Sequence, residues 1–206
     1  NLNTYYMLYN EQLILTGELD DVGTPIRTNS GSSYRMGIET EASMKLSEDF
    51  LIKTNLTLSS NKNQQVLSKF DGKIFDFGKT NISFSPEIIT SNSIIYSPND
   101  RLMISFLSKY VGKQFMGNTD AVNSILDSYF VNNINFSFSI NSNQIFDQII
   151  ISGLFNNIFD KEYVSNGYYY TYDDTWSSPG QVKTLDGAGY YPQAERNFLI
   201  GLTFKF

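Results

Sequence analysis

The sequence has no cysteine and no histidine among its 206 residues. The absence of cysteine excludes a disulfide scaffold, thiolate-bound zinc and a cysteine nucleophile. The absence of histidine excludes a Ser-His-Asp triad and imidazole metal ligands, and it removes the commonest general base near neutral pH. Only carboxylate, tyrosine or lysine chemistry remains for an enzyme. We therefore expect a protein that is not an enzyme, with no catalytic residues, no bound metal and no cofactor.

Charged residues are also scarce, at 17% of the chain, against about 25% in ordinary soluble domains. The net charge is −6, whereas a nucleic-acid-binding protein usually carries clustered positive charge, so we expect no nucleic-acid partner. Aromatic residues reach 15%, with 14 Tyr and 16 Phe. A mixture of apolar and neutral polar residues with few ions is expected where one face of a sheet meets lipid and the other meets water.

The sequence lacks any run of about 18 apolar residues, and it therefore predicts no transmembrane helix. Membrane β-strands alternate apolar and polar residues, so the mean hydropathy of −0.25 fits a membrane barrel as well as a soluble chain. The chain starts at Asn1 without a methionine or a signal peptide. We expect a mature fragment or a piece of a longer chain.

Period-two alternation dominates the chain, and it predicts an all-β fold. It is clearest over residues 196–206 and recurs over residues 34–46, 51–59 and 129–140. Weaker strands are predicted at residues 2–15, 81–97, 101–112 and 146–159. The total is about eight strands, each near the roughly 9–11 residues that a tilted membrane strand needs.

The predicted connections alternate in length. Short turns rich in Asn, Asp, Ser and Pro are expected at residues 47–49, 98–100 and 141–143, and long loops at 16–33, 61–79, 113–127 and 160–195. Long loops on one side and short periplasmic turns on the other are typical of outer-membrane barrels. A soluble β-sandwich also alternates, but it gives no reason to separate loop lengths by side and would favour packed Val, Ile and Leu over Phe and Tyr. We predict a transmembrane antiparallel β-barrel segment in the outer membrane of a Gram-negative bacterium.

Six stretches, in order along the chain, resemble the C-terminal part of the barrel of a TonB-dependent outer-membrane receptor, of the kind common in Bacteroidetes-type bacteria. Residues 5–29 (YYMLYNEQLILTGELDDVGTPIRTN) with 33–42 (SYRMGIETEA) resemble one barrel hairpin, and 108–119 (SKYVGKQFMGNT) with 126–133 (LDSYFVNN) resemble another. Residues 154–168 (LFNNIFDKEYVSNGY) are similar to the penultimate-strand motif, and 190–206 (YYPQAERNFLIGLTFKF) to the closing strand.

This resemblance implies that residues 1–206 are the C-terminal portion of a barrel of roughly 22 strands, without its plug domain. It implies TonB-coupled uptake of a scarce nutrient such as an iron–siderophore complex, haem, cobalamin or a glycan. The implied partners are outer-membrane lipid, the rest of the barrel and the plug, TonB through the missing N-terminal part, the barrel-assembly machinery and a surface lipoprotein. Two alternatives stay open. One is a self-contained eight-stranded barrel with a structural or adhesive role, and the other, weaker one is an outer-membrane hydrolase.

The loop at residues 160–195 holds the most distinctive candidate residues. Tyr and Trp side chains offer flat contact area with polar tips, which suits sugars, porphyrins or catecholates, and paired Asp could add hydrogen bonds or a calcium contact. The alternative is that the tyrosines form an outer aromatic girdle and an apolar loop core. We predict ligand contact for the loop as a unit. Its candidate residues are Tyr168, Tyr169, Tyr170, Tyr172, Asp173, Asp174 and Trp176.

Two further sets follow from alternation. Arg35, Glu39, Glu41 and Lys53 should face the barrel lumen, where they would form opposite-charge pairs across strands or contact the plug. The closing strand places five apolar residues on one face, and they would form part of the periplasmic aromatic girdle, the C-terminal signal for barrel assembly that the resemblance implies, or both. They are Phe198, Ile200, Leu202, Phe204 and Phe206.

Overall fold

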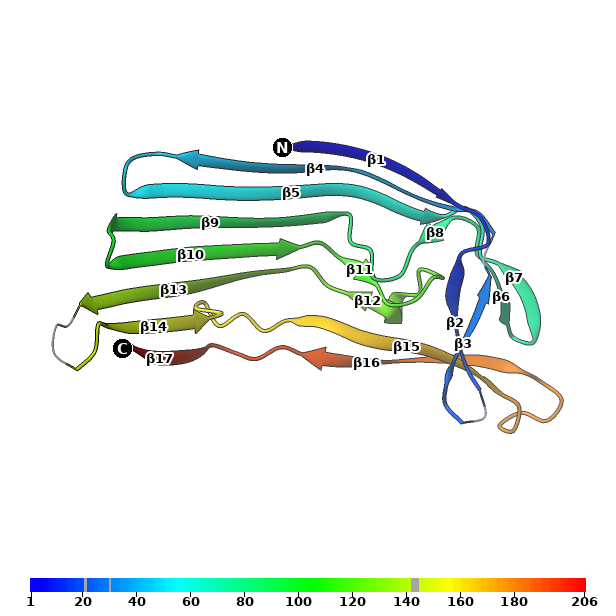
Figure 1. The fold of residues 1–206 in the computed structure, drawn as a ribbon. Helices are drawn as coiled ribbons and strands as arrows, with labels where there is room; N and C mark the ends of the chain where they lie inside the picture. The colour runs from blue at the N-terminus through cyan, green and yellow to red at the C-terminus, as the bar shows by residue number, and fades with distance from the viewer. Residues whose placement is uncertain (21, 30, 142–144) are drawn as a thin grey trace.

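Eight long strands lie side by side in one antiparallel sheet, which we call the wall (Figure 1). The computed structural model describes residues 1–20, 22–29, 31–141 and 145–206. None of the helices in these ranges is long and apolar enough to cross a membrane. The predicted all-β architecture and the predicted number of wall strands are both confirmed. In spatial order the strands are β1 (Leu2–Tyr9), β4 (Ser33–Lys45), β5 (Phe50–Asn63), β9 (Ile88–Asn99), β10 (Leu102–Val111), β13 (Tyr129–Asn141), β14 (Gln148–Asn156) and β17 (Asn197–Lys205).

The register of the wall keeps apolar and polar residues on opposite faces. Across three neighbouring strands, Ile104 lies opposite Phe136, and Phe136 lies opposite Gly153 on the apolar face. One position along, Ser137 lies opposite Ser152 on the polar face. Large apolar side chains on the first face, such as Phe138 and Ile200, are exposed. A single sheet has no second layer to cover that face, as expected of a wall whose outer face is solvated by lipid.

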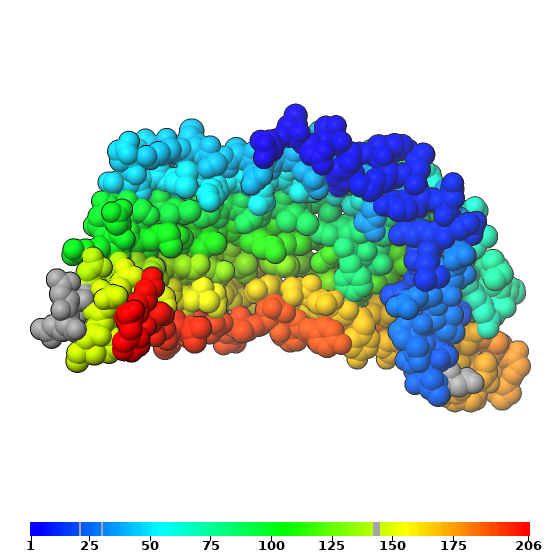
Figure 2. Space-filling view, viewed as in Figure 1, coloured from blue at the N-terminus to red at the C-terminus, as the bar shows by residue number. Residues whose placement is uncertain are grey.

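The polar face is the concave one. Polar-face residues of β1, β4, β5 and β9 line a single hollow of about 400 Å³. In a barrel whose outside meets lipid, the polar face is the lumen face and the apolar face is the outside. The two chain ends run along opposite borders of the wall (Figure 2).

The two border strands do not meet. Strand β1 pairs with β4 and β17 pairs with β14, and they are the first and last strands of the sheet order. The described residues therefore do not close into an eight-stranded barrel. They form an open segment of a larger one, as the sequence predicts.

One end of the wall carries short turns and the other carries long excursions, which confirms the predicted asymmetry. The described short connections are residues 46–49 and 100–101, and the predicted turn at 141–143 lies mostly outside the described residues. The long loops, however, are themselves largely β-structure, which the sequence-based prediction missed. Their elements are β2 (Leu13–Leu19) with β3 (Pro25–Asn29), β6 (Leu67–Phe70) with β7 (Lys73–Asp76), β8 (Thr80–Asn81), β11 (Gln114–Phe115), η1 (Val122–Ser124), β12 (Ile125–Leu126), and β15 (Val164–Asp174) with β16 (Lys183–Pro192).

Two predicted strand boundaries are wrong for local reasons. The strand expected at residues 2–15 divides into β1 and β2, because Glu11 adopts a left-handed φ of 55° between them. The strand expected from residue 81 begins only at Ile88, because residues 82–86 fold over the lumen face and Pro86 lacks the N–H that a ladder needs.

The buried core lies in the excursions rather than in the middle of the wall. Four apolar side chains at the long-loop end of the wall are at most 4% exposed, and all come from connections or short strands. They are Val66, Ile82, Met116 and Leu126. The amide nitrogen of the buried Asn63 side chain donates to Thr80 Oγ1 and to the Asn81 carbonyl, whereas its Oδ1 has no hydrogen-bond partner among the described residues. This packed layer, the mouth layer, holds the candidate site.

Candidate functional site

The mouth layer joins excursions that leave the wall far apart. The β2–β3 hairpin follows β1, the β6–β7 hairpin follows β5, and the β15–β16 hairpin stands on β14 and β17 at the other border. Thr171 of β15 forms a parallel bridge to Glu18 of β2. This bridge joins the β2–β3 and β15–β16 hairpins into one four-stranded sheet. Figure 1 shows that β2 and β3 cross from the β1 border to β15 at this end of the wall.

The β6–β7 hairpin is fastened to β15–β16 by three polar contacts, which we call the latch. Lys69 Nζ lies 2.7 Å from Asp173 Oδ2. The Asp71 amide donates to Thr184 Oγ1 at 2.7 Å, and the Thr184 amide donates to Asp71 Oδ1 at 2.8 Å. The hydrogen bond from Lys69 lowers the pKa of the Asp173 carboxyl, and the same contact raises the pKa of Lys69.

A cavity of about 210 Å³ lies inside the mouth layer. Its wall includes Tyr169, whose hydroxyl donates to Asp186 Oδ2 at 3.3 Å. Burial and the neighbouring Asp186 carboxylate raise the pKa of Tyr169 to about 12, so its hydroxyl is a neutral donor at physiological pH. The remaining lining residues are hydroxyl, apolar and charged side chains from four excursions, namely Thr16, Ser68, Lys69, Phe70, Phe77, Thr119, Ala121, Thr171, Thr184 and Asp186.

The predicted loop residues do not form one cluster, because β15 alternates and divides them between two faces. Tyr169 and Asp173 lie on the face that meets the β6–β7 hairpin and the cavity. Tyr168, Tyr170 and Tyr172 lie on the opposite face. Trp176 joins them, with its ring 6.3 Å from that of Tyr172. The residues predicted to contact a ligand as a unit therefore lie on two faces of the hairpin, and their contact with a ligand stays a prediction.

The paired aspartates have separate structural roles. Asp173 bonds Lys69 and Thr184, whereas Asp174 Oδ1 accepts the amides of Trp176 and Ser177 and so shapes the turn after β15. Hydrogen bonds from Ser177 are the main reason that the pKa of Asp174 is lowered. Within the residues that the structure describes, no three acidic side chains gather as a metal site.

The predicted lumen residues lie on the concave face, but they do not pair with one another as opposite charges. Arg35 Nη1 donates to Ser85 Oγ at 2.9 Å, and Asn3 donates to Glu39 at 3.1 Å. Lys53 lies between Ser43 and Ser93 in register. Neutral neighbours on the adjoining strands replace the expected ion pairs. Glu41, the last of the four predicted lumen residues, likewise accepts a hydrogen bond from the neutral Asn1 side chain at 3.2 Å.

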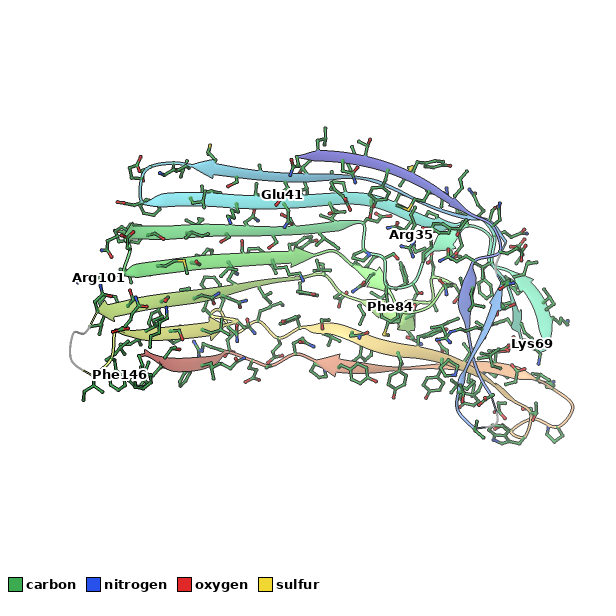
Figure 3. All side chains as sticks on the ribbon, viewed as in Figure 1. Arg35, Glu41, Lys69, Phe84, Arg101 and Phe146 are labelled. Carbon is green, nitrogen blue, oxygen red and sulfur yellow. The ribbon has the colours of Figure 1, made fainter. Side chains whose placement is uncertain are left out.

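Phe84 is a lumen residue that alternation did not reveal. It lies in the segment that folds over the concave face, lines the same hollow as Arg35 and Glu39, and is 41% exposed (Figure 3). Its φ of 51° is left-handed, which is unusual for a phenylalanine. The backbone is held there because the Phe84 amide donates to the Phe115 carbonyl at 2.8 Å. In the sequence, the one indication that the strand pattern is interrupted here is Pro86, two residues after Phe84.

The C-terminal apolar residues follow the predicted face. Phe198, Ile200, Leu202 and Phe204 lie on the apolar outside of β17, and Phe206 follows its last residue, Lys205. Phe146, at the short-turn end of β14, lies 4.9 Å from Phe204 and 5.0 Å from Phe206 between ring centroids. These three rings form an aromatic group at the short-turn rim.

No protein-family model matches the chain, and no curated protein matches it in sequence. Solved structures do match. The siderophore receptor PiuA from Acinetobacter baumannii is 14% identical with a TM-score of 0.66, over 100% of this chain and 26% of that one. The copper transporter OprC is 16% identical with a TM-score of 0.65, over 100% and 28%. The ferric-catecholate import receptor Fiu from E. coli K12, in its closed form, is 16% identical with a TM-score of 0.64, over 98% and 24%.

This chain thus spans about a quarter of the length of the structures it matches. At these identities the likeness concerns the fold, and it agrees with the open sheet. The chain has the fold of one part of the large antiparallel β-barrel that these structures contain.

Proposed function

We propose that this chain is the C-terminal part of the barrel of a TonB-dependent receptor that takes up a scarce nutrient across the outer membrane of a Gram-negative bacterium. The carrying observation is the open wall. It has a polar concave face, an apolar convex face and two border strands, β1 and β17, that lack partners on their outer edges in the described residues. Unpaired backbone groups are costly in lipid, so such a wall needs the remaining strands of a barrel.

The Bacteroidetes-type affiliation is part of this proposal and is supported by the sequence resemblance alone. The nutrient class stays broad, because the matching structures are named for siderophore and ferric-catecholate import and for copper transport. Iron–siderophore, haem, cobalamin and glycan ligands are all candidates. Transport rather than catalysis is favoured, because Glu39 and Glu41 bond asparagine side chains and face an open concave surface.

Within this function, we assign plug contact to the concave face and ligand contact to the mouth layer. Arg35, Glu39, Glu41 and Lys53 face the volume that a plug would fill, and Phe84 projects into the same hollow. Tyr169 and Asp173 are the predicted loop residues that remain on the mouth side. TonB would act through the plug, the barrel-assembly machinery would engage the closing strand, and a surface lipoprotein would meet the mouth layer from outside.

The test is uptake by cells that carry or lack the full-length gene, with labelled iron–siderophore, haem, cobalamin, copper and oligosaccharide offered in turn. We expect one substrate to accumulate only in cells with the gene, and this accumulation to stop when the proton-motive force is collapsed or TonB is deleted. Equal accumulation of every substrate in both strains would overturn the transport function. Accumulation that persists without TonB would overturn the coupling.

A further inference from the structure

The outward face of the β15–β16 hairpin carries a row of aromatic rings that the proposed transport function does not use. We call this row the aromatic platform. Neighbouring ring centroids are 6.1 Å (Tyr168–Tyr170), 6.4 Å (Tyr170–Tyr172) and 6.3 Å (Tyr172–Trp176) apart. The planes differ by 25°, 20° and 7°. Tyr191 extends the row at the other end, 6.0 Å from Tyr168.

Glycines on the partner strand make the platform flat. Tyr168 lies opposite Gly189 and Tyr170 lies opposite Gly187. A Cβ on either glycine would overlap the ring of the facing tyrosine, so each ring lies down over bare backbone. Rings laid side by side on a sheet present their faces, rather than their edges, to the surroundings.

The platform is open, and the two charged residues on its face, Asp174 and Lys183, lie at its Trp176 end. Tyr168 is 52% exposed and Trp176 is 69% exposed. The Tyr169 and Tyr190 hydroxyls on the other face bond Asp186 and the Asn123 carbonyl. The hydroxyls of Tyr168, Tyr170 and Tyr172 have no hydrogen-bond partner in the described part of the chain. The platform therefore offers ring faces together with free hydroxyl groups.

The platform faces away from the mouth. The opposite face of the hairpin holds the latch to β6–β7, which arrives over the concave side, so the platform continues the convex, apolar side of the wall. In Figure 3, several ring side chains of the β15–β16 hairpin lie on its side away from β10 and β13. A ligand inside the barrel would not meet these rings.

Three zones follow one another up this outer side. Phe155 and Phe198 end the apolar face of β14 and β17. Next comes a charged zone in which the Arg196 amide donates to Asp160 Oδ1 at 2.7 Å, and Lys161 and Glu162 are exposed beside Phe130 of the apolar face. The aromatic platform lies beyond it. Apolar residues match acyl chains and charged residues match headgroups, so the platform stands at the level beyond the headgroups.

We infer that the aromatic platform binds the saccharide of a glycolipid in the outer leaflet of the surrounding membrane. Aromatic faces carry negative quadrupole charge and attract the weakly positive C–H faces of sugar rings, and free tyrosine hydroxyls can bond sugar hydroxyls. This inference rests on the outer-membrane orientation in the proposed function but not on transport. A receptor that imports nothing would still show this binding.

The test uses the full-length receptor in detergent and, as the probe, the lipid-free oligosaccharide released from lipopolysaccharide, with binding measured by calorimetry. We expect the native receptor to bind and the Y168A/Y170A/Y172A variant to bind at least tenfold more weakly. The matched Y168F/Y170F/Y172F variant keeps the rings, and we expect it to stay within threefold of native. A native receptor that does not bind, or an alanine variant that binds as tightly as native, would overturn the inference.

Two further measurements keep the result decisive. Heat-modifiable gel mobility shows whether the alanine variant forms its barrel, and if it does not, W176A at the exposed hairpin end takes its place with the same expected weakening. A linear glucan, offered separately, represents a free glycan in the medium. Platform-dependent binding of the glucan without binding of the lipopolysaccharide oligosaccharide would overturn the membrane assignment.

Discussion

The ring of Phe136 lies over Gly153 on the apolar face of the wall, directly across the β13–β14 pair. A Cβ on Gly153 would overlap that ring. The glycine thus makes room for an aromatic side chain that lies flat along the apolar face of the sheet.

Replacing Gly153 with valine should therefore destabilise the wall. The added side chain would push Phe136 out of its rotamer, and overpacking of this kind costs about 1–3 kcal/mol. The measurement is the unfolding midpoint of the full-length protein in detergent, followed by heat-modifiable gel mobility. Gly201→Ala is the control, because the single close neighbour of its Cβ would be the Ser152 hydroxyl, which can rotate away. Equal losses in both variants would contradict the role given to Phe136.

Adjacent positions on β14 should differ sharply in their access to water. Ile151 lies on the apolar outside and Ser152 on the concave face. Since this chain has no cysteine, Ile151→Cys and Ser152→Cys each introduce one thiol into it. After reconstitution into vesicles, we expect a charged maleimide to label the Ser152 position at least tenfold faster. Labelling in the reverse order would invert the assignment of lumen and lipid faces.

The separation of the two border strands can be tested by cross-linking within the full-length barrel. Ser137 and Ser152 are register partners, so the Ser137→Cys/Ser152→Cys variant should form a disulfide under mild oxidation. Asn3 and Thr203 lie on opposite border strands and both on the polar face, and the corresponding double variant should stay reduced. Efficient bridging of the second pair would indicate a closed eight-stranded barrel instead.

The latch should hold the β6–β7 hairpin against β15–β16 over a wide pH range. The folded pKa of Asp173 is lowered from 3.8, so its contribution is present above that value and is lost as pH falls through the lower folded pKa. The folded pKa of Lys69 is raised from 10.5, so its contribution is present below that value and is lost as pH rises through the higher one. Hydrogen exchange of residues 67–76, corrected for its intrinsic pH dependence, should show constant protection from about pH 5 to 9 and a loss below about pH 4.

Asp71→Ala removes one of the two reciprocal hydrogen bonds of the latch at any pH. A net hydrogen-bond contribution near 1 kcal/mol predicts roughly fivefold faster exchange in residues 67–76 at neutral pH. Asp76→Ala is the matched control, because Asp76 bonds only Gln65 and Gly78 of its own excursion. Equal acceleration by both would mean that the hairpin is ordered by itself rather than by the latch.

The wall was predictable because its side chains follow one rule at every position. The face of Phe198, Ile200 and Leu202 could be read from alternation alone, and so could the lumen side of Arg35 and Glu39. A single sheet between lipid and water needs no long-range packing to decide which side is which. The sequence therefore carries this part of the fold locally.

The mouth layer was not predictable in the same way. The residue pairs Lys69–Asp173 and Asp71–Thr184 join segments more than 100 residues apart, and nothing in the local pattern of either segment indicates the other. The long aromatic loop was expected to act as one ligand surface. Its extension into a hairpin turned alternate tyrosines to opposite sides, so the same alternation that identified the wall also divided the site.

Phe84 offers a last test. Its left-handed backbone should lower the stability of the barrel, whereas its exposed ring should strengthen contact with the plug. A left-handed φ on a bulky residue costs about 1 kcal/mol or more, and asparagine tolerates that conformation better. Phe84→Asn should therefore leave the barrel as stable as native or slightly more stable. The loss of the ring from the concave hollow should weaken contact with the plug, so limited proteolysis should release the plug of the full-length protein several-fold faster. A variant with native plug protection and lowered barrel stability would show that the ring serves the wall itself, and that the strain at Phe84 has no part in holding the plug.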